Sequence, residues 1–405
     1  MRTMKNKIII FITFLFTSNI SSAQDILNYY LEIAEKNNPT LKAKFEEYNA
    51  SLEKIPQAGS FPDPQITFGY FVLPIETKNG PQQFKLSFNQ MFYWMGTVIS
   101  KKNVFISKSK SKYEDFEESK SKLFFQIKST FYDLYFNKKT IDVYIENLDI
   151  LNTLKQLALI KVEVGKTSSV SVLRIDMEIN ELENNIALLK DQWLVNLVKF
   201  RKTLNVDDSF SVHIPNNLWD DDLEYNKQAI MYNMKKDNHS LKSLDLIKES
   251  YIHTEKLAKK LTKPNFLVGI DYNSIDIGKD AFMVKAGLTI PINRKKNTAM
   301  IKEAVIKQNV IEHQKENKIN DLEKLFEKVY SEYIDAKRRL DLYTKQTKLA
   351  KRALELLQNE YANNGRNFEE ILRMNRKVLK FSLELEKAKV DKQTSIAFIY
   401  YLMGL

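Results

Sequence analysis

The tripeptide Gly165-Lys166-Thr167 has the residue types that end a phosphate-binding loop. In such a loop several backbone N–H groups converge on the phosphates, and a further glycine stands five residues before the tripeptide's own glycine. That position is Ile160, and the segment 148–164 has the pattern of a helix, whereas the motif requires a strand there. The sequence therefore argues against nucleotide binding, and Gly165 needs another explanation.

Other residue types that could do chemistry are few. The chain contains no Cys and four His, so it has no disulfide framework and no thiolate metal site. No two His stand at a spacing typical of metal ligands. The run Asp220-Asp221-Asp222 offers three carboxylates, but adjacent side chains point in different directions, and we interpret the run as a solvated loop. We expect no enzyme, no cofactor and no metal site.

The basic composition raises the question of nucleic acid, because the net charge of the chain is +11. The lysines are spread along helical patterns and mixed with Glu and Asp, which is typical of a solvated helix surface. We therefore expect no nucleic-acid partner.

The first residues have the organisation of a secretory signal peptide. Basic residues at 2, 5 and 7 precede the short apolar run 8–16 and the small residues Ser21-Ser22-Ala23. The apolar run is too short to span a bilayer as a helix. We expect cleavage after Ala23, so that the signal peptide is 1–23 and the mature protein lies outside the inner membrane.

Two stretches are long enough to form unusually long helices. Residues 97–164 and 294–364 contain neither Gly nor Pro, and at about 1.5 Å per residue each could form a helix roughly 100 Å long. Apolar residues in the second stretch recur every three or four positions, which predicts a narrow coiled-coil seam. The seam residues are Leu322, Leu325, Val329, Tyr333, Ala336, Leu340, Tyr343, Ala350, Leu354, Leu357 and Tyr361.

The chain has the pattern of two copies of one unit, offset by about 200 residues. Residues that match across this offset are Asn38 with Asn238, Pro64 with Pro264, Gly69 with Gly269, and Lys85 with Lys285. We predict repeat 1 over 24–204, a linker over 205–224 and repeat 2 over 225–405. Each copy has a first helix (26–55 and 225–261), a β-hairpin (65–92 and 265–292) and two long helices joined by a turn (near 165 and near 365).

Both hairpins alternate between apolar and polar residues, as strands with one apolar face do. Ile66, Phe68 and Tyr70 share a face, whereas Lys85 and Lys285 lie on the polar faces of the return strands. A soluble sheet would turn these polar faces to water. After a secretion signal, the same pattern also fits outer-membrane strands, with the two lysines facing the lumen of a barrel. Aromatic residues at 92–94 are placed as an interfacial girdle would be.

Four membrane strands cannot close a barrel, and open strand edges cannot lie in lipid. If the strands span a membrane, several chains must share one barrel, and three chains would supply twelve strands, an even number in the usual range. The long helices would continue as a second, helical barrel. The predicted fold class is α+β, made mainly of long helical coiled coils with two β-hairpins.

Gly165 falls where one long helix ends and the next begins, and Asn364-Gly365 has the same place in repeat 2. Gly and Asn tolerate the left-handed conformation that ends a helix. The hydroxyl residues 167–169 can cap the returning helix. Lys166-Thr167 is therefore interpreted as turn chemistry at the tip of a helical hairpin.

The arrangement resembles the TolC family of outer-membrane efflux proteins, and the resemblance covers nearly the whole mature chain. It rests on the internal repeat and on three segments. These are residues 38–70, 162–174 (VEVGKTSSVSVLR) and 361–373 (YANNGRNFEEILR). The length of the chain and the FEEILR sequence look like the branch of CusC-type and cobalt-zinc-cadmium export channels.

The resemblance implies a homotrimer with a twelve-stranded barrel in the outer membrane and a helical tunnel across the periplasm. It implies a passive exit duct for small molecules or metal ions in a tripartite efflux system. A periplasmic adaptor and an inner-membrane pump of the RND type would dock at the helical tip. The tip residues are Gly165, Lys166, Thr167, Asn364 and Gly365.

In the family pattern an acidic residue commonly lies six positions after the turn glycine. Repeat 2 has Glu370 there, counted from Asn364, whereas repeat 1 departs from the pattern with a serine. Arginines near both turns could hold the tip closed by pairing with its carboxylates; ordinary solvated helix charges are the alternative. The candidate gate residues are Ser171, Arg174, Glu369, Glu370 and Arg373.

Two alternatives to this duct stay open from the sequence. A periplasmic coiled-coil adaptor or scaffold without a channel would use the same helical seam but would leave the strand pairs without a role. An exit duct for protein secretion would share the whole architecture, and the sequence does not choose among metal, drug and protein cargo.

Overall fold

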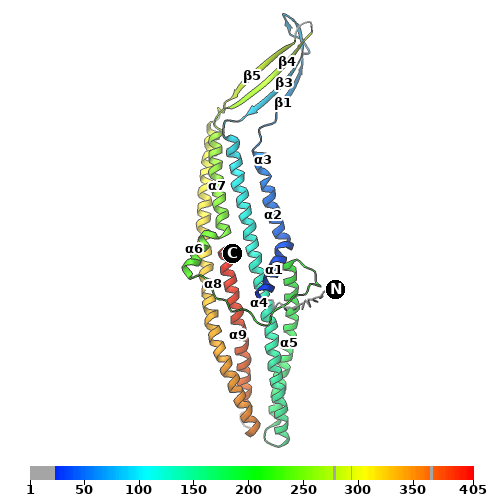
Figure 1. Ribbon diagram of the computed structural model, residues 1–405, viewed down its shortest axis with the longest axis vertical. Coiled ribbons are helices and arrows are strands. Elements are labelled where there is room, and N and C mark those ends of the chain that lie inside the picture. Colours follow the sequence, from blue (N-terminus) through cyan, green and yellow to red (C-terminus); the bar gives the residue numbers. More distant parts are fainter. Residues whose placement is uncertain (1–22, 277–279, 293, 365–367) are drawn as a thin grey trace, which may run out of the picture.

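The computed structural model describes residues 23–276, 280–292, 294–364 and 368–405. The molecule is elongated, with a sheet at one end and the reversals of its long helices at the other (Figure 1). The expected signal peptide lies outside the described residues except for Ala23, which begins the first helix. None of the helices in the described part of the chain combines the length and apolar character that a membrane crossing needs.

The elements of the two halves follow one another in a similar order. The first half contains α1 (Ala23–Asn37), α2 (Pro39–Leu52), α3 (Lys54–Ala58), β1 (Gln65–Tyr70), β2 (Glu76–Thr77), β3 (Gly80–Phe92), α4 (Thr97–Glu163) and α5 (Ser169–Leu204). The second half contains α6 (Lys227–Asp237), α7 (His239–Lys260), β4 (Asn265–Ile275), β5 (Ala281–Thr289), α8 (Arg294–Asn364) and α9 (Phe368–Leu402). Helices α4 and α8 have 67 and 71 residues, which confirms the two long helices predicted from the absence of Gly and Pro.

The single first helix predicted for each repeat is wrong. Residues 26–55 are divided among α1, α2 and α3, and the second copy is divided between α6 and α7. The breaks occur at Asn38 and Asn238, whose side-chain oxygens accept hydrogen bonds from the backbone N–H groups three residues later, at 3.0 and 3.3 Å. Asn favours these breaks because its short side chain caps the helix that follows.

Three apolar clusters lie along the helices. One joins α1 to the middle of α4 and the end of α5, around Tyr30, Phe131 and Phe200. Another lies between the long helices near their reversals, and a third joins α6, α8 and the end of α9. Most residues of the seam predicted on α8 are buried in the last two clusters, but Leu325 is 43% exposed in the single chain.

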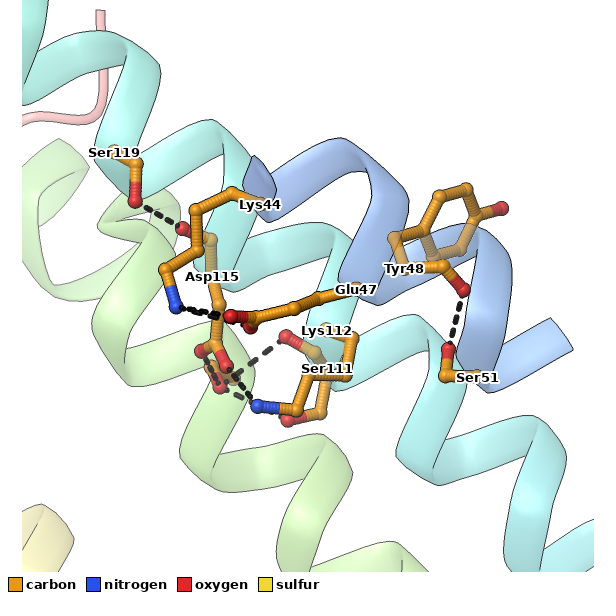
Figure 2. Close-up of polar contacts among 9 residues, drawn as sticks. Lys44, Glu47, Tyr48, Ser51, Ser111, Lys112, Asp115 and Ser119 are labelled. Atoms are coloured by element: carbon orange, nitrogen blue, oxygen red, sulfur yellow. Dashed lines mark hydrogen bonds and ion pairs between the residues drawn. The ribbon is translucent and has the colours of Figure 1, made fainter. Parts of the chain in front are cut away.

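Small side chains let α4 pack closely against α2 and α7, because the distance between helices depends on the side chains at their contact. Ser109 and Ser111 of α4 are buried, and the Ser111 Oγ lies 3.0 Å from the Ser243 Oγ of α7. The Asp115 carboxylate accepts a hydrogen bond from Ser243 at 2.7 Å and pairs with Lys112 at 3.3 Å. Figure 2 shows Ser111, Lys112 and Asp115 gathered at this junction.

Candidate functional site

The two hairpins form one continuous antiparallel sheet in the order β1-β3-β4-β5, and the short β2 pairs with β3 (Figure 1). The link between them is the β3–β4 ladder, in which Lys85 lies opposite Asn273 and Phe88 opposite Ile270. Among the described residues, β1 and β5 each have a strand on one side only. The sheet therefore ends in two open edges.

One face of the sheet is apolar and exposed. The strand register aligns Phe68, Leu86, Tyr272 and Phe282 in one row across all four strands. The exposed apolar residues of this face include Ile66, Phe68, Tyr70, Leu86, Phe88, Val268, Ile270, Phe282, Val284 and Leu288. Two of them show how open the face is, since Ile66 is 70% and Val284 is 78% exposed. A continuous apolar surface of this kind marks contact with lipid or with another protein.

The opposite face holds a cluster of three charged residues. Asp271 of β4 lies between Lys85 of β3 and Lys285 of β5, with ammonium-to-carboxylate distances of 2.7 and 2.5 Å. The Asp271 side chain is fully covered, whereas those of Lys85 and Lys285 are 36% and 30% exposed. The structure thus places both lysines on the polar face, together with a shared carboxylate that sequence reasoning missed.

Two glycines on the polar face differ in the space around them. A Cβ added at Gly269 of β4 would lie 2.8 Å from the carbonyl oxygen of Phe88 on β3, closer than real atoms approach. A Cβ added at Gly287 of β5 would lie 3.5 Å from a methyl group of Leu267, an ordinary contact. Gly269 is therefore needed for the close approach of the strands that join the hairpins.

Aromatic side chains collect where the sheet meets the helices, at the place where the sequence predicts a girdle. Trp94 stacks on Phe266 with the ring centroids 5.6 Å apart. The Lys101 ammonium lies 3.8 Å from the ring centroid of Tyr93. An apolar groove of about 670 Å³ beside them includes Met95, whose side chain is 81% exposed. Aromatic residues with an apolar body and a polar edge suit a boundary between lipid and water.

At the other end of the molecule, Gly165 ends α4. Its φ of +69° is the left-handed conformation predicted for it. The N–H groups of Gly165 and Lys166 donate to carbonyl oxygens in the last turn of α4, at 3.0 and 2.8 Å, which is the Schellman pattern of a helix C-terminus. The Ser168 hydroxyl then caps α5. The Gly-Lys-Thr sequence therefore forms a helical turn and no phosphate loop.

Arginine–carboxylate pairs lie near both reversals of the long helices. Arg174 of α5 pairs with Glu369 of α9, so this ion pair joins the two helix pairs of the chain. Arg373 instead pairs with Glu370 on its own helix, at 2.6 Å. The hydrogen bond from Arg373 lowers the pKa of Glu370. Both carboxylates therefore have arginine partners within the single chain.

The remaining candidate tip residues make local contacts or lie outside the described chain. The Ser171 Oγ lies 3.4 Å from the Thr167 Oγ1. Asn364 is the last residue of α8, and Gly365 falls outside the described residues. The role of these residues in docking stays a prediction.

The acidic run between the two halves is an exposed loop, as the sequence predicts, and it also binds a buried lysine. The Lys392 side chain on α9 is 4% exposed, and its ammonium pairs with Asp220 and Asp222 at 2.7 Å each. Asp222 also pairs with Lys337 of α8 at 2.7 Å. Burial lowers the pKa of Lys392, but its hydrogen bonds to the two carboxylates outweigh burial and raise it. Charge therefore fixes this loop to α8 and α9.

Within the part of the chain that the structure describes, no group of three or more His, Asp or Glu side chains is arranged to hold a metal ion.

Solved structures similar to this chain are outer-membrane channels. The channel OprN is 14% identical, with 95% of this chain and 91% of that chain covered at a TM-score of 0.77. The outer-membrane protein VceC of Vibrio cholerae is 13% identical, with 93% and 95% covered at 0.72. CusC, described in terms of transmembrane channel formation, is 13% identical, with 94% and 92% covered at 0.75. This chain has the fold of an outer-membrane channel. No protein-family model and no curated protein matches the sequence.

In this channel fold, the sheet and the helical tip stand at opposite ends of α4 and α8 (Figure 1). A signal for Asp271 was present in the sequence, because it is the charged residue of β4 and alternation puts it on the polar face. Its pairing with Lys85 depends on the β3–β4 register, which no local pattern predicts. The burial of Lys392 could not be predicted from the sequence, because a lysine on a helix is usually exposed.

Proposed function

We propose that this protein is the exit duct of a tripartite efflux system and works as a homotrimer in the outer membrane. The sheet is the observation that carries the proposal. One of its faces is apolar and exposed, the other holds the charged cluster, and both outer strands have an open edge among the described residues. A single chain would leave unpaired backbone groups in lipid, so partner strands are required.

Three chains supply those partners. Each contributes β1, β3, β4 and β5, and three sets of four strands give twelve, an even number within the range of outer-membrane barrels. Strand β5 of one chain would pair with β1 of the next, with the apolar faces toward lipid and the polar faces toward a lumen. The long helices of the three chains would continue below the barrel as a periplasmic tunnel.

An internal duplication accounts for the similar order of elements in the two halves. Asn38 and Asn238 support it, because each caps a helix and also donates to a carbonyl oxygen near the end of a long helix. The Asn38 amide donates to Thr203 O at 3.5 Å, and the Asn238 amide donates to Leu402 O at 3.0 Å. We assign the two copies to 24–204 and 225–405.

The helical tip is proposed to meet a periplasmic adaptor and, through it, an RND-type inner-membrane pump that supplies the energy for export. The turn around Gly165 is open, since an added Cβ would meet no atom within 4 Å. Val164 and Val170 on either side are 60% and 51% exposed. The turn thus offers apolar side chains and the Lys166 charge to a partner, while the duct itself stays passive.

A gate at the tip is part of the proposal. Opening the tunnel requires the helix pairs to separate, and the Arg174–Glu369 pair opposes that movement because it joins them. Its side chains are 51% and 69% exposed, so a single pair contributes little, at most about 1 kcal/mol. Three copies around the axis, together with Arg373 and Glu370, would set the resting state of the tip.

Planar-bilayer conductance of the detergent-extracted protein tests the duct, with the mass of the complex measured in the same preparation. Discrete conductance steps from a trimer are expected. A protein that needs no detergent and conducts no current would refute the duct, and the sheet would then be a docking surface of a soluble protein.

A further inference from the structure

The charges of the sheet are concentrated at one place. Among the residues of β1, β3, β4 and β5, three are charged, and these are Lys85, Asp271 and Lys285 of the cluster described above. Their face is the one that would line the barrel. We propose that this cluster makes the membrane section of the duct selective for anions, an inference that rests on the proposed function.

The charge that a passing ion meets is more positive than the sum of the cluster. Two lysines and one aspartate give +1 per chain. The Asp271 side chain is fully covered, whereas about a third of each lysine side chain is exposed, 36% for Lys85 and 30% for Lys285. An ammonium group has three donors, so each lysine that contacts Asp271 keeps donors for water or for an anion in the lumen.

Position within the sheet strengthens this effect. The register places Asp271 opposite Ser87 on β3 and Met283 on β5, with further residue pairs on both sides. In a trimer the three clusters would stand at one height and form a ring. A ring of one sign inside a low-dielectric wall raises the local concentration of counter-ions. The electrostatic potential of the ring extends into the lumen by about one screening length, which is about 8 Å at physiological salt and about 3 Å at 1 M.

Carboxylates at the turn end of the sheet serve as a comparison. Asp276 accepts a hydrogen bond from Gln83 at 2.5 Å, and Asp280 accepts one from Tyr272 at 2.5 Å. Asp276 follows the last residue of β4, where the barrel would open into bulk water. Charges there are screened more strongly than charges within the strands.

The test is the reversal potential of the trimer in planar bilayers across a KCl gradient at low ionic strength. A wall potential of about one kT raises the chloride concentration about threefold and lowers that of potassium about threefold, so the wild-type duct should prefer chloride over potassium by about sevenfold. Lys85→Gln with Lys285→Gln should abolish or invert this preference, and Lys85→Arg with Lys285→Arg should retain it. Asp271→Asn removes a negative charge and should increase the preference. Asp276→Asn makes the same change at the mouth of the barrel and should change the chloride preference little.

The outcomes separate the inference from the function on which it rests. A wild-type trimer that conducts no current refutes the duct itself. A wild-type duct that conducts without preferring chloride overturns the role of the cluster and leaves the duct intact. The same holds if the glutamine and Asp271→Asn variants have the chloride preference of the wild type. If the glutamine variant does not assemble, the contrast between Asp271→Asn and Asp276→Asn decides, and equal effects refute the proposal.

Discussion

The buried lysine of α9 allows a sharp test of how charge fixes the loop between the two halves. Lys392 is 4% exposed and pairs with Asp220 and Asp222, which are 75% and 49% exposed. The two sides of the pair therefore differ in their access to water. Removing the carboxylates leaves a buried ammonium without its partners, whereas removing the ammonium leaves carboxylates that water can solvate.

This asymmetry sets the expected magnitudes. Breaking a buried ion pair by deleting one side costs about 3–5 kcal/mol. For Asp220→Ala with Asp222→Ala we expect about 3 kcal/mol, the lower end of that range, because a loop this exposed lets water reach the lysine. For Lys392→Met, which keeps the volume and removes the charge, we expect less than about 1 kcal/mol. Adding Lys392→Met to the double alanine variant should recover most of its loss.

Amide hydrogen exchange in the loop and the adjoining part of α9 measures these changes as local opening. About 3 kcal/mol corresponds to a roughly hundredfold faster exchange, and 1 kcal/mol to about fivefold. Conductance of the same preparations shows whether each variant assembles. If Lys392→Met opens the loop as much as the double alanine variant does, then the pairing itself holds the loop, and the reasoning from burial is refuted.

The same loop should respond to acid. Hydrogen bonds from Lys337 and Lys392 lower the pKa of Asp222 from 3.8 to about 2. Because the pKa in the folded protein lies below that in the unfolded chain, Asp222 stabilises the fold above pH 3.8. That contribution is lost as the pH falls from about 4 toward 2. Exchange in the loop should accelerate over this interval, and it should do so less in Asp222→Ala.

Three further predictions concern the sheet, the tip and the helix junction. Gly269→Ala should reduce the yield of trimer, measured by gel mobility without heating, whereas Gly287→Ala should not, because Gly269 has no room for a methyl group. Arg174→Ala and Glu369→Ala, which remove the ion pair between the two helix pairs, should leave trimer yield unchanged and increase single-channel conductance; unchanged conductance in both would exclude them from a gate. Ser243→Leu should overpack the buried contact between α4 and α7 by about 1–3 kcal/mol, seen as faster exchange in α7.

Local sequence patterns were sufficient to predict the features that depend on residues close together in the chain. The absence of Gly and Pro predicted α4 and α8, and the left-handed turn at Gly165 followed from the place of a glycine between two helical patterns. Alternation predicted the faces of the strands because successive side chains point to opposite sides. The sequence analysis predicts one continuous helix across Asn38 and one across Asn238, because it follows the apolar pattern and does not consider the capping side chain.

Partners from distant parts of the chain could not be predicted. Asp271 meets Lys85 only because β3 of the first half pairs with β4 of the second. The Asp220-Asp221-Asp222 run is exposed, as predicted, but nothing local indicated that it also pairs with a lysine on α9. Both pairings were missed because a charged residue in a helical or strand pattern, such as Lys392 or Asp271, is usually assigned to water. A buried charge needs a partner, and here the partners come from other elements.

The placement of the ion pairs gives them a role beyond local stability. Lys351 pairs with Glu146 and Arg376 with Glu178, across separations of 205 and 198 residues, both close to the offset of about 200 residues that the sequence pattern predicts. The pairs thus join positions of the two halves that lie close to this offset. A repeating apolar seam alone would tolerate sliding by one repeat of its pattern, because the same residue types would meet again. Ion pairs at single positions form in one alignment only, so these exposed pairs add a preference for the observed alignment of the two halves, each by at most about 1 kcal/mol.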